Sequence, residues 1–443
     1  MRKKIVLAAI LATMSAATTA ATLEDVVVQG LNTNPEVQRA LNARNAVYQE
    51  VVQARAGYLP TFDFAGGFGW EKTNNTTTRA DGHDNVELHR KELSLSLRQM
   101  IFDGFATKQE VERQTARADS ADQRVIETAE KYALDAARAY LEVMRRQELL
   151  QQAKETLYSH VRIYDQIKRR SESGLGALAS IQQAEGRLAL AEVNVLAAEN
   201  NLIDAQASYQ RITGMMPEGE FSMPKLEVSY PESREDAVKQ ALDNHPTLGV
   251  AAADTMAAMA QYEAARARWS PRVHLEVDRT WNNDIDGVDG INEDFVAMLR
   301  LRYNIYNGGA DRARVRQTQH QIEEAKSIAM DTHRQVVQSV ELSWNAKDIL
   351  ERQIPYLQQH VVASEQTRNS YQKQFNIGQR SLLDLLDTEN EVFSAKNDLT
   401  NALYDHMISE YRLLNGMGQL LDTLQLVLPE PNLGNVKSEQ EPG

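Results

Sequence analysis

The sequence predicts a mostly α-helical protein that also contains membrane β-strands and is internally duplicated. Three observations support this fold class: a repeat, segments of alternating apolar and polar residues, and two very long helical runs. The repeat is clearest where residues 54–60 recur as 265–271, and where 98–104 recur as 302–308, in the same order. Each copy would supply strands to a membrane barrel and long helices to an α-barrel tunnel, which indicates a conduit.

The N-terminus has the features of a secretory signal. Basic residues at 2–4 precede an apolar segment at 5–14 and small residues near Ala20 and Ala21, which is the order found in cleaved signal peptides. We assign residues 1–21 to this signal, because the apolar run is too short to span a bilayer. The chain has no cysteine, so we predict no disulfide, no thiolate metal site and no acceptor for an N-terminal lipid anchor.

The composition argues against several classes of protein. Of the 443 residues, 42% are hydrophobic but only 6% are aromatic, which is typical of helical bundles and coiled coils. The formal net charge of −14 argues against a nucleic-acid partner. The nine histidines are scattered, and the sequence contains no nucleophile motif, P-loop or HExxH motif. We therefore predict no enzyme activity, no cofactor and no metal site.

The first structural repeat is assigned to residues 22–213. It begins with a short helix, followed by a second helix that Asn34 and Pro35 start as N-cap and first helical residue. A β-hairpin at about 60–103 follows, and a long helical pair at 105–213 completes the repeat. The returning helix of this pair has apolar residues at steps of three and four, which predicts coiled-coil packing. They are Ile181, Ala184, Leu188, Ala191, Val195, Ala198, Leu202, Ala205, Tyr209 and Ile212.

The second repeat is assigned to residues 235–418, with a β-hairpin at about 271–307 and a long helical pair at 310–417. Uninterrupted helix is expected in the first member of each pair, and each would be roughly 100 Å long. Residues 214–234, rich in proline, glycine and glutamate, are predicted to form a connector, the equatorial region. Residues 419–443 form a C-terminal tail that we expect to be partly disordered.

Alternation defines the strands, each of which has about the 9–11 residues that a tilted membrane strand needs. The alternative is a half-buried hairpin of a soluble domain, but little else in this exported chain could cover the apolar faces. Because four strands cannot close a barrel, the chain must oligomerise, and two, three or more copies satisfy this requirement. The apolar positions are Phe62, Phe64, Phe68, Trp70, Leu93, Leu95, Leu97, Ile101, Val273, Leu275, Val277, Trp281, Phe295, Ala297, Leu299, Leu301, Tyr303 and Ile305.

These halves, hairpins, paired helices and glycine-centred turns resemble the TolC family of outer-membrane channel proteins. The resemblance covers about residues 23–420 and is most specific at 375–387. It implies a homotrimer with a twelve-stranded barrel in the outer membrane and a helical tunnel in the periplasm. The partners that it implies are outer-membrane lipid, a periplasmic adaptor (membrane fusion protein) and an inner-membrane ABC or proton-driven transporter.

The resemblance also implies a pore constriction at Asp384 and Asp387. These residues lie three apart, so on a helix they face the same way on successive turns. In a threefold assembly they would form two stacked rings of carboxylates that attract cations. The alternative interpretation is two solvated aspartates on an exposed face.

The predicted tip gate departs from the family pattern. In the family, a tyrosine–aspartate hydrogen bond and an arginine–threonine contact hold the closed tip. Phe375 occupies the tyrosine position and Ser180 that of its partner, whereas Arg380 is retained and Ala179 replaces the threonine. Since phenylalanine has no hydroxyl to donate, we expect other contacts to close this tip.

Adaptor docking in the family centres on a Gly-Leu turn between the paired helices. This turn corresponds to Gly174, Leu175 and Gly176 in the first repeat. The corresponding turn of the second repeat contains Gly378 and lacks the leucine. We expect these residues to contact the adaptor.

The segment 282–293 comes close to an EF-hand calcium loop, with oxygen-bearing side chains at loop positions 1, 3, 5 and 12 and glycine at position 6. Its first position is Asn282 rather than aspartate, and strands rather than helices are predicted on either side. We favour a polar barrel loop facing the exterior, with calcium binding as the alternative.

Two classes of function remain open. The first is an export duct of the outer membrane, serving type I protein secretion or, alternatively, multidrug or small-molecule efflux. The missing lipid-anchor cysteine resembles the secretion-capable branch of the family, so secretion is favoured. The second class is a structural coiled-coil protein of the periplasm without a pore, which would leave the alternating strands unexplained.

Overall fold

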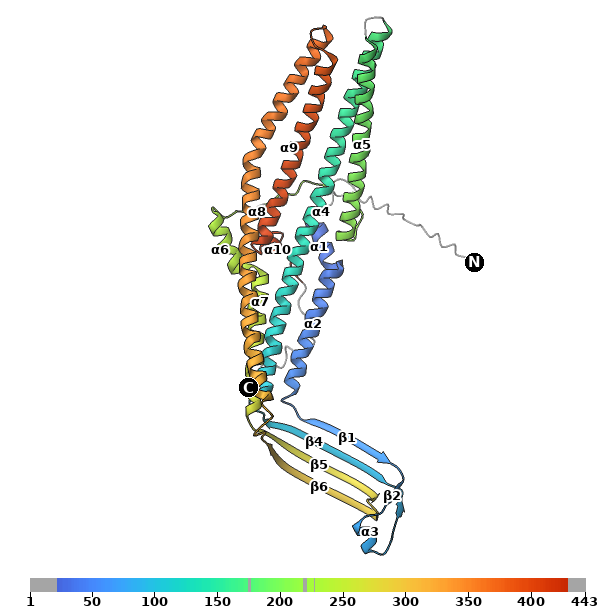
Figure 1. Ribbon diagram of the computed structural model, residues 1–443, viewed down its shortest axis with the longest axis vertical. Coiled ribbons are helices and arrows are strands. Elements are labelled where there is room, and N and C mark those ends of the chain that lie inside the picture. Colours follow the sequence, from blue (N-terminus) through green and yellow to red (C-terminus); the bar gives the residue numbers. More distant parts are fainter. Residues whose placement is uncertain (1–21, 174–176, 218–220, 227, 429–443) are drawn as a thin grey trace, which may run out of the picture. The chain divides into compact units, whose positions relative to one another are not determined.

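A computed structural model describes residues 22–173, 177–217, 221–226 and 228–428 (Figure 1). The predicted signal at residues 1–21 lies outside these residues. The described chain divides into two compact units, and both repeats contribute to each unit. We call them the sheet unit (Glu36–Thr128 and Val238–Ser339) and the helical unit (Ala129–Ala237 and Val340–Val427, with the residues up to Pro35).

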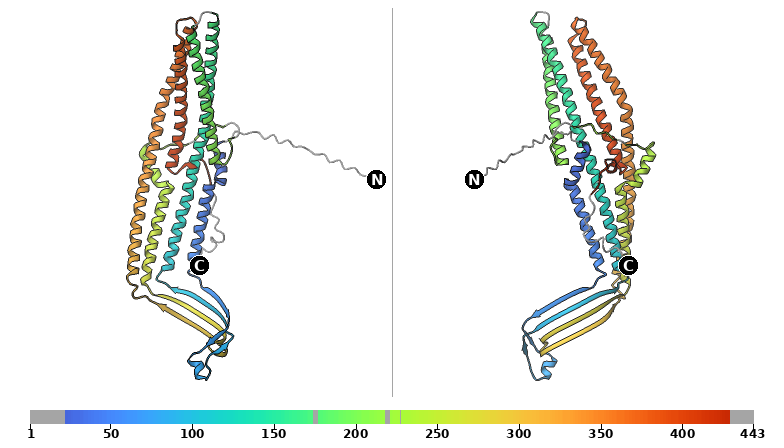
Figure 2. Two further views of the ribbon diagram at one scale, coloured as in Figure 1. Left: turned by 45° about the vertical axis from the view of Figure 1, so that its right-hand side comes forward. Right: turned by 180° about the vertical axis from the view of Figure 1, so that it is seen from behind.

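The sheet unit contains a four-stranded antiparallel sheet in the order β1-β4-β5-β6 (Figures 1 and 2). The first-repeat hairpin pairs with the second-repeat hairpin through β4 and β5. The predicted strands are therefore confirmed, and they form one sheet. The strands are β1 (Thr61–Phe68), β4 (Lys91–Phe102), β5 (Arg272–Ile285) and β6 (Val288–Arg302). Tyr303 and Ile305 lie beyond β6, so the prediction that they belong to it was wrong.

The register of this sheet separates apolar from polar side chains. Phe62 lies opposite Leu97, which lies opposite Val277 on the next strand. The neighbouring row, on the other face, carries Asp63 and Asp278. Phe62 is 66% exposed, so the apolar face is open. Since successive residues of a strand point to opposite faces, this pairing gives the sheet one apolar and one charged face.

The hairpin ends are more ordered than the sequence predicts. The segment between β1 and β4 of the first hairpin folds as β2 (Glu71–Thr73), α3 (Thr76–Ala80) and β3 (Val86–Leu88). Asn75 starts α3 with a capping box, because its side chain accepts from Thr78 N and the Thr78 hydroxyl accepts from Asn75 N. A helix this short gives little periodic signal, so alternation alone could not reveal it.

Segment 282–293 is the end of the second hairpin rather than a long loop. The strands β5 and β6 continue to a tight turn in which Asp286 and Gly287 both have positive φ, 55° and 81°. Such values suit a type I′ turn. Arg90 reaches this turn, with its Nη1 2.8 Å from the Asp286 carboxylate, and Asn75 donates to the Asp286 carbonyl at 2.9 Å. The predicted polar loop is therefore confined to the turn at Asp286 and Gly287, and the rest of the segment is strand.

Three further helices belong mainly to the sheet unit: α2 (Pro35–Ala56), α6 (Arg234–Asn244) and α7 (Pro246–Arg266), which continues as the 3-10 turn η1 (Ala267–Trp269). His245 caps α7, with its Nδ1 accepting from Thr247 N at 3.3 Å. The first turns of α4 and α8 complete this unit.

The helical unit is built from paired long helices. Its elements are α1 (Leu23–Thr33), α4 (Ala106–Glu172), α5 (Leu178–Thr213), α8 (Ala310–Asn376), α9 (Leu382–Gly416) and α10 (Leu420–Thr423). Both α4 and α8 have 67 residues. All ten predicted stripe positions of α5 are buried or half-buried, which confirms that this stripe faces the packing seam. No helix of the described ranges is both long and apolar enough to cross a membrane.

The prediction of an uninterrupted helix at 310–376 overlooked Pro355, which lies inside α8. Proline has no N–H and cannot donate to the carbonyl of Glu351, and its ring crowds the preceding turn. The helix nevertheless continues on both sides. The tertiary contacts of this helix therefore outweigh a cost of about 3 kcal/mol.

The connector and the tail contain residues that pack against the helices, which the sequence did not indicate. The Phe221 ring lies edge-on to the rings of Tyr140 and Tyr209, at centroid distances of 4.6 and 5.6 Å. At the other end, Leu420 and Leu421 of α10 are buried. The part of the predicted tail from residue 429 onward lies outside the described residues.

Candidate functional site

The tip of the helical unit has its own apolar core. Leu385 and Leu386 at the start of α9 are almost fully buried there, at 0% and 1% exposure. The two helical pairs meet in this cluster, so it fixes the turn of the second repeat against α4 and α5. Its members are Ile163, Ile167, Ala184, Phe375, Leu382, Leu385 and Leu386.

Gly378 forms the turn between α8 and α9. Its φ of +79° lies in the left-handed region, which glycine enters without steric cost. Gly378 N donates to Phe375 O at 3.1 Å, and Gln379 N donates to Gln374 O at 2.9 Å. These two bonds are those of a Schellman motif, which ends α8. The residue predicted to dock an adaptor is therefore also the C-cap of the helix.

Asp384 lies three residues into the start of α9 and belongs to a capping box. Ser381 Oγ donates to its carboxylate at 2.8 Å, and Asp384 N donates to Ser381 Oγ at 3.2 Å. Hydrogen bonds from the Ser381 hydroxyl and backbone N–H lower the pKa of Asp384. An Arg380 nitrogen lies 3.9 Å from the same carboxylate. Asp384 therefore carries a negative charge at neutral pH and strengthens the helix N-terminus.

Asp387, one turn further along α9, pairs with the first repeat. Arg187 Nη2 on α5 lies 3.0 Å from its carboxylate, and the Asp387 side chain is 57% exposed. This partner could not be predicted from the sequence, because nothing in either segment indicates that α5 and α9 lie at this register. The two predicted constriction residues thus have different partners, one local and one across the packed helical pairs.

The residues of the predicted gate occupy three different environments. Phe375 is buried in the tip core, and the Arg170 guanidinium lies 5.8 Å from its ring centroid. Arg380 donates from Nε to Gln374 at 2.9 Å and lies 4.2 Å from the Tyr371 ring centroid. Ser180 is half-buried at the start of α5. Phe375 and Arg380 are thus held by packing, one hydrogen bond and cation–π contacts.

One further contact joins the pairs close to the tip. Gln166 of α4 donates from Nε2 to Asn376 Oδ1 of α8 at 3.0 Å. Together with the pair between Arg187 and Asp387, it is a polar tie between the two repeats. The predicted docking residues Gly174, Leu175 and Gly176 lie outside the described residues.

The charged face of the sheet carries an ordered cluster of its own. Glu276 accepts from Arg98 at 2.8 Å and from Arg300 at 2.5 Å. Two arginines against one carboxylate leave an excess of positive charge within this cluster. Among the residues described, no group of three His, Asp or Glu side chains has the geometry of a metal site.

Comparisons with known proteins agree with this architecture. Residues 26–215 and 237–419 match the family described as outer membrane efflux protein. Outer membrane protein TolC of Escherichia coli is 25% identical over 90% of this chain and 82% of its own length. The alkaline protease secretion protein AprF of Pseudomonas aeruginosa is 24% identical over 91% and 85%. The cation efflux system protein CusC of Escherichia coli is 22% identical over 83% and 82%.

Solved structures have the same fold at low sequence identity. The Campylobacter jejuni CmeC outer membrane channel superposes with a TM-score of 0.81 at 15% identity, covering 94% of this chain and 89% of that one. The outer-membrane channel OprN gives 0.80 at 17% identity, covering 90% of both chains. These structures confirm the fold, and the family match confirms the predicted resemblance and the predicted localisation. The chain therefore belongs to the outer membrane efflux protein family and is a protein of the outer membrane.

Proposed function

We propose that this protein is an export duct that works as a homotrimer. The register of the four-stranded sheet carries this proposal, because it gives one apolar face, one charged face and two edge strands, β1 and β6. Lipid does not tolerate unpaired strand edges, so β1 of one copy must pair with β6 of the next. Three copies give a twelve-stranded barrel with the charged faces lining its lumen.

An exposed stripe on α8 supports the same assembly. Leu342, Ile349 and Tyr356 follow one another at intervals of seven residues and are all exposed. Apolar residues at this spacing form one face of a helix that packs on another helix. In the trimer this face would lie against a helix of the next copy, which continues the barrel as a helical tunnel.

The duct would carry substrate from an inner-membrane ABC or proton-driven transporter, through a periplasmic adaptor, across the outer membrane. We favour type I protein secretion, because AprF is named for protease secretion and the chain has no cysteine for a lipid anchor. Small-molecule efflux is the second candidate, supported by the similarity to CusC, which is named for cation efflux. The energy would come from the transporter, so the duct itself needs no catalytic residues.

We place the constriction of the duct at Asp384 and Asp387. Both side chains are partly exposed, and their partners Ser381, Arg380 and Arg187 lie within the same chain. In a trimer, the three copies of each carboxylate would form a ring, and the two stacked rings would attract cations. Phe375, Arg380 and Ser180 would hold this tip closed, and the turns containing 174–176 and Gly378 would receive the adaptor.

Reconstitution tests the proposal directly. Purified protein, sized by chemical cross-linking, is added to a planar lipid bilayer. The proposal predicts a cross-linked trimer and discrete conductance steps. A monomer that leaves the bilayer silent would contradict it. Deletion of the gene separates the two routes: loss of a secreted protein at unchanged drug tolerance supports secretion, and the reverse supports efflux.

A further inference from the structure

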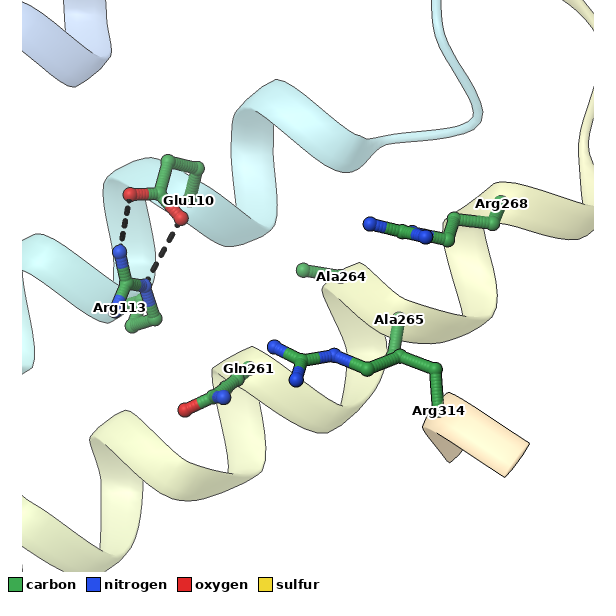
Figure 3. A pocket seen from close by; sticks show the side chains of 7 residues that line it. All are labelled: Glu110, Arg113, Gln261, Ala264, Ala265, Arg268 and Arg314. Carbon is green, nitrogen blue, oxygen red and sulfur yellow. Dashed lines mark hydrogen bonds and ion pairs between the residues drawn. The ribbon is translucent and has the colours of Figure 1, made fainter. Parts of the chain in front are cut away.

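A cavity in the sheet unit is lined by three arginines, and no established role of the fold accounts for them. Its walls come from the start of α4, the end of α7 with η1, and the start of α8. Figure 3 shows the guanidinium groups of Arg268 and Arg314 extending over α7 in the direction of Glu110 and Arg113. The floor consists of small or neutral side chains: Gln261, Ala264 and Ala265.

The charges that line this cavity do not balance. Glu110 is its one lining carboxylate, and Arg113 holds it with two bonds of 2.9 and 2.6 Å. Arg268 lies 3.7 Å from Asp311, which is a longer and weaker contact. Arg314 donates to the neutral amide of Gln317 at 2.9 Å. Three fixed positive charges therefore face one lining carboxylate that is already bound, and an anion between Arg268 and Arg314 would neutralise the excess.

The cavity lies where the strands give way to helices. Arg268 precedes the start of β5 by four residues, and Arg314 lies four residues after the start of α8, which follows β6. Arg113 is seven residues into α4, or roughly 10 Å along the helix. Aromatic side chains are exposed at the same junction: Tyr58, Phe105, Trp269, Tyr303 and Tyr306. Aromatic residues in such positions mark the headgroup level of a membrane.

We infer that this arginine cavity binds the phosphate group of a membrane phospholipid at the periplasmic boundary of the sheet. The inference rests on the proposed membrane position of the strands. Guanidinium groups bind phosphate oxygens in bidentate fashion and stay charged at every physiological pH. The cavity volume of about 200 Å³ greatly exceeds the roughly 10–15 Å³ that one water needs on the same measure, so a phosphate group has room.

The test uses full-length protein and counts bound lipid by native mass spectrometry. The probes are phosphatidylglycerol and diacylglycerol, which lacks the phosphate. We expect phosphatidylglycerol to bind the unmodified protein, and Arg268→Gln with Arg314→Gln to weaken this binding about tenfold, as loss of two charge-assisted contacts implies. The matched control, Arg312→Gln with Arg316→Gln, removes the same charge from α8 outside the cavity and should bind as before.

Other occupants give other results. If inorganic phosphate alone binds as tightly as the lipid, the site takes a free anion and the lipid inference is overturned. If the cavity variant instead no longer forms a trimer while its lipid binding is unchanged, the arginines pair with a carboxylate of a second copy. This result would also overturn the lipid inference. Flotation with phosphatidylcholine vesicles is measured for every variant. Failure to float would contradict the membrane sheet, whereas equal phosphatidylglycerol binding by both double variants contradicts only the lipid site.

Discussion

The carboxylates at the two ends of α9 have opposite environments. At the tip, Asp387 is largely exposed and paired with Arg187, and hydrogen bonds from Ser381 lower the pKa of Asp384. At the other end, Glu130 of α4 is 3% exposed and accepts from Leu421 N at 3.0 Å and from Asn415 Nδ2 at 3.1 Å. Burial raises the pKa of Glu130 to about 7.

This difference separates a carboxylate that is exposed to solvent from a buried carboxyl group that holds helices together. Asp384 remains ionised at neutral pH because its pKa is lowered, and both tip aspartates are exposed to solvent. Glu130 instead anchors the corner between α9 and α10 to α4, where it is half protonated near neutral pH. The acidity of the sequence therefore does not indicate by itself which carboxylates are charged at neutral pH, because burial decides.

The largest effect is expected when the packing beneath the tip aspartates is removed. Leu385→Ala would leave a cavity in the tip core and cost about 2–5 kcal/mol. Leu383→Ala is the matched control, because Leu383 is 46% exposed two residues away on the same helix. Hydrogen exchange of the first turns of α9 should accelerate strongly in the Leu385 variant. Equal acceleration in both variants would mean that the core does not hold the tip.

The buried end can be tested through pH. The pKa of Glu130 rises from 4.5 to about 7 on folding, so between these values the native state keeps a proton that the unfolded state has lost. The stability from this group is fully present below about pH 4.5 and is lost as the pH rises through 7. The loss is about 3 kcal/mol. Glu130→Gln should remove this slope, as measured by unfolding between pH 4.5 and 8.

A control for this experiment lies on the same helix. Asp135→Asn removes a carboxylate that is 39% exposed in its side chain, and it should leave the slope of stability against pH unchanged. A Glu130→Gln protein with the unmodified slope would show that the native and unfolded states differ at some other group.

A smaller effect on stability is expected for the tie between repeats. Arg187→Gln breaks an exposed pair and should cost about 0.2–1 kcal/mol, yet it frees Asp387 and should raise the cation preference of the channel. Lys396→Gln is the control, because it breaks a pair of 2.8 Å with Glu365 inside the second helical pair alone. Selectivity measured from reversal potentials should change in the first variant only.

Much of the fold was predictable because strands and helices differ in the spacing of their apolar residues. Alternation located all four strands, and the three-and-four spacing of α5 located its packing face correctly. Features that leave no periodic pattern of apolar residues could not be predicted. Pro355 lies inside α8 without ending it, although the sequence pattern took no account of a proline there. Segment 282–293 was predicted as a loop, because the contact between Asn75 and the turn at Asp286 joins segments that are distant in the sequence.

The contacts of the candidate site residues could not be predicted from the sequence, and the site itself stays a prediction. The resemblance indicated Asp384 and Asp387, whereas the Arg187 partner depends on the register between α5 and α9. Glu130 could not have been singled out, because its raised pKa arises from burial by segments far away in the chain. The arginine cavity likewise joins three segments that are separate in the sequence.

The most direct test is the selectivity of a variant that neutralises the tip. Asp384→Asn with Asp387→Asn is compared, in planar bilayers, with Glu391→Gln and Asp398→Asn, which neutralise two exposed carboxylates further along α9. The account predicts that the tip variant loses its cation preference and its block by divalent cations, while the control keeps both. An unchanged tip variant, or an equal loss in the control, would contradict the constriction at Asp384 and Asp387.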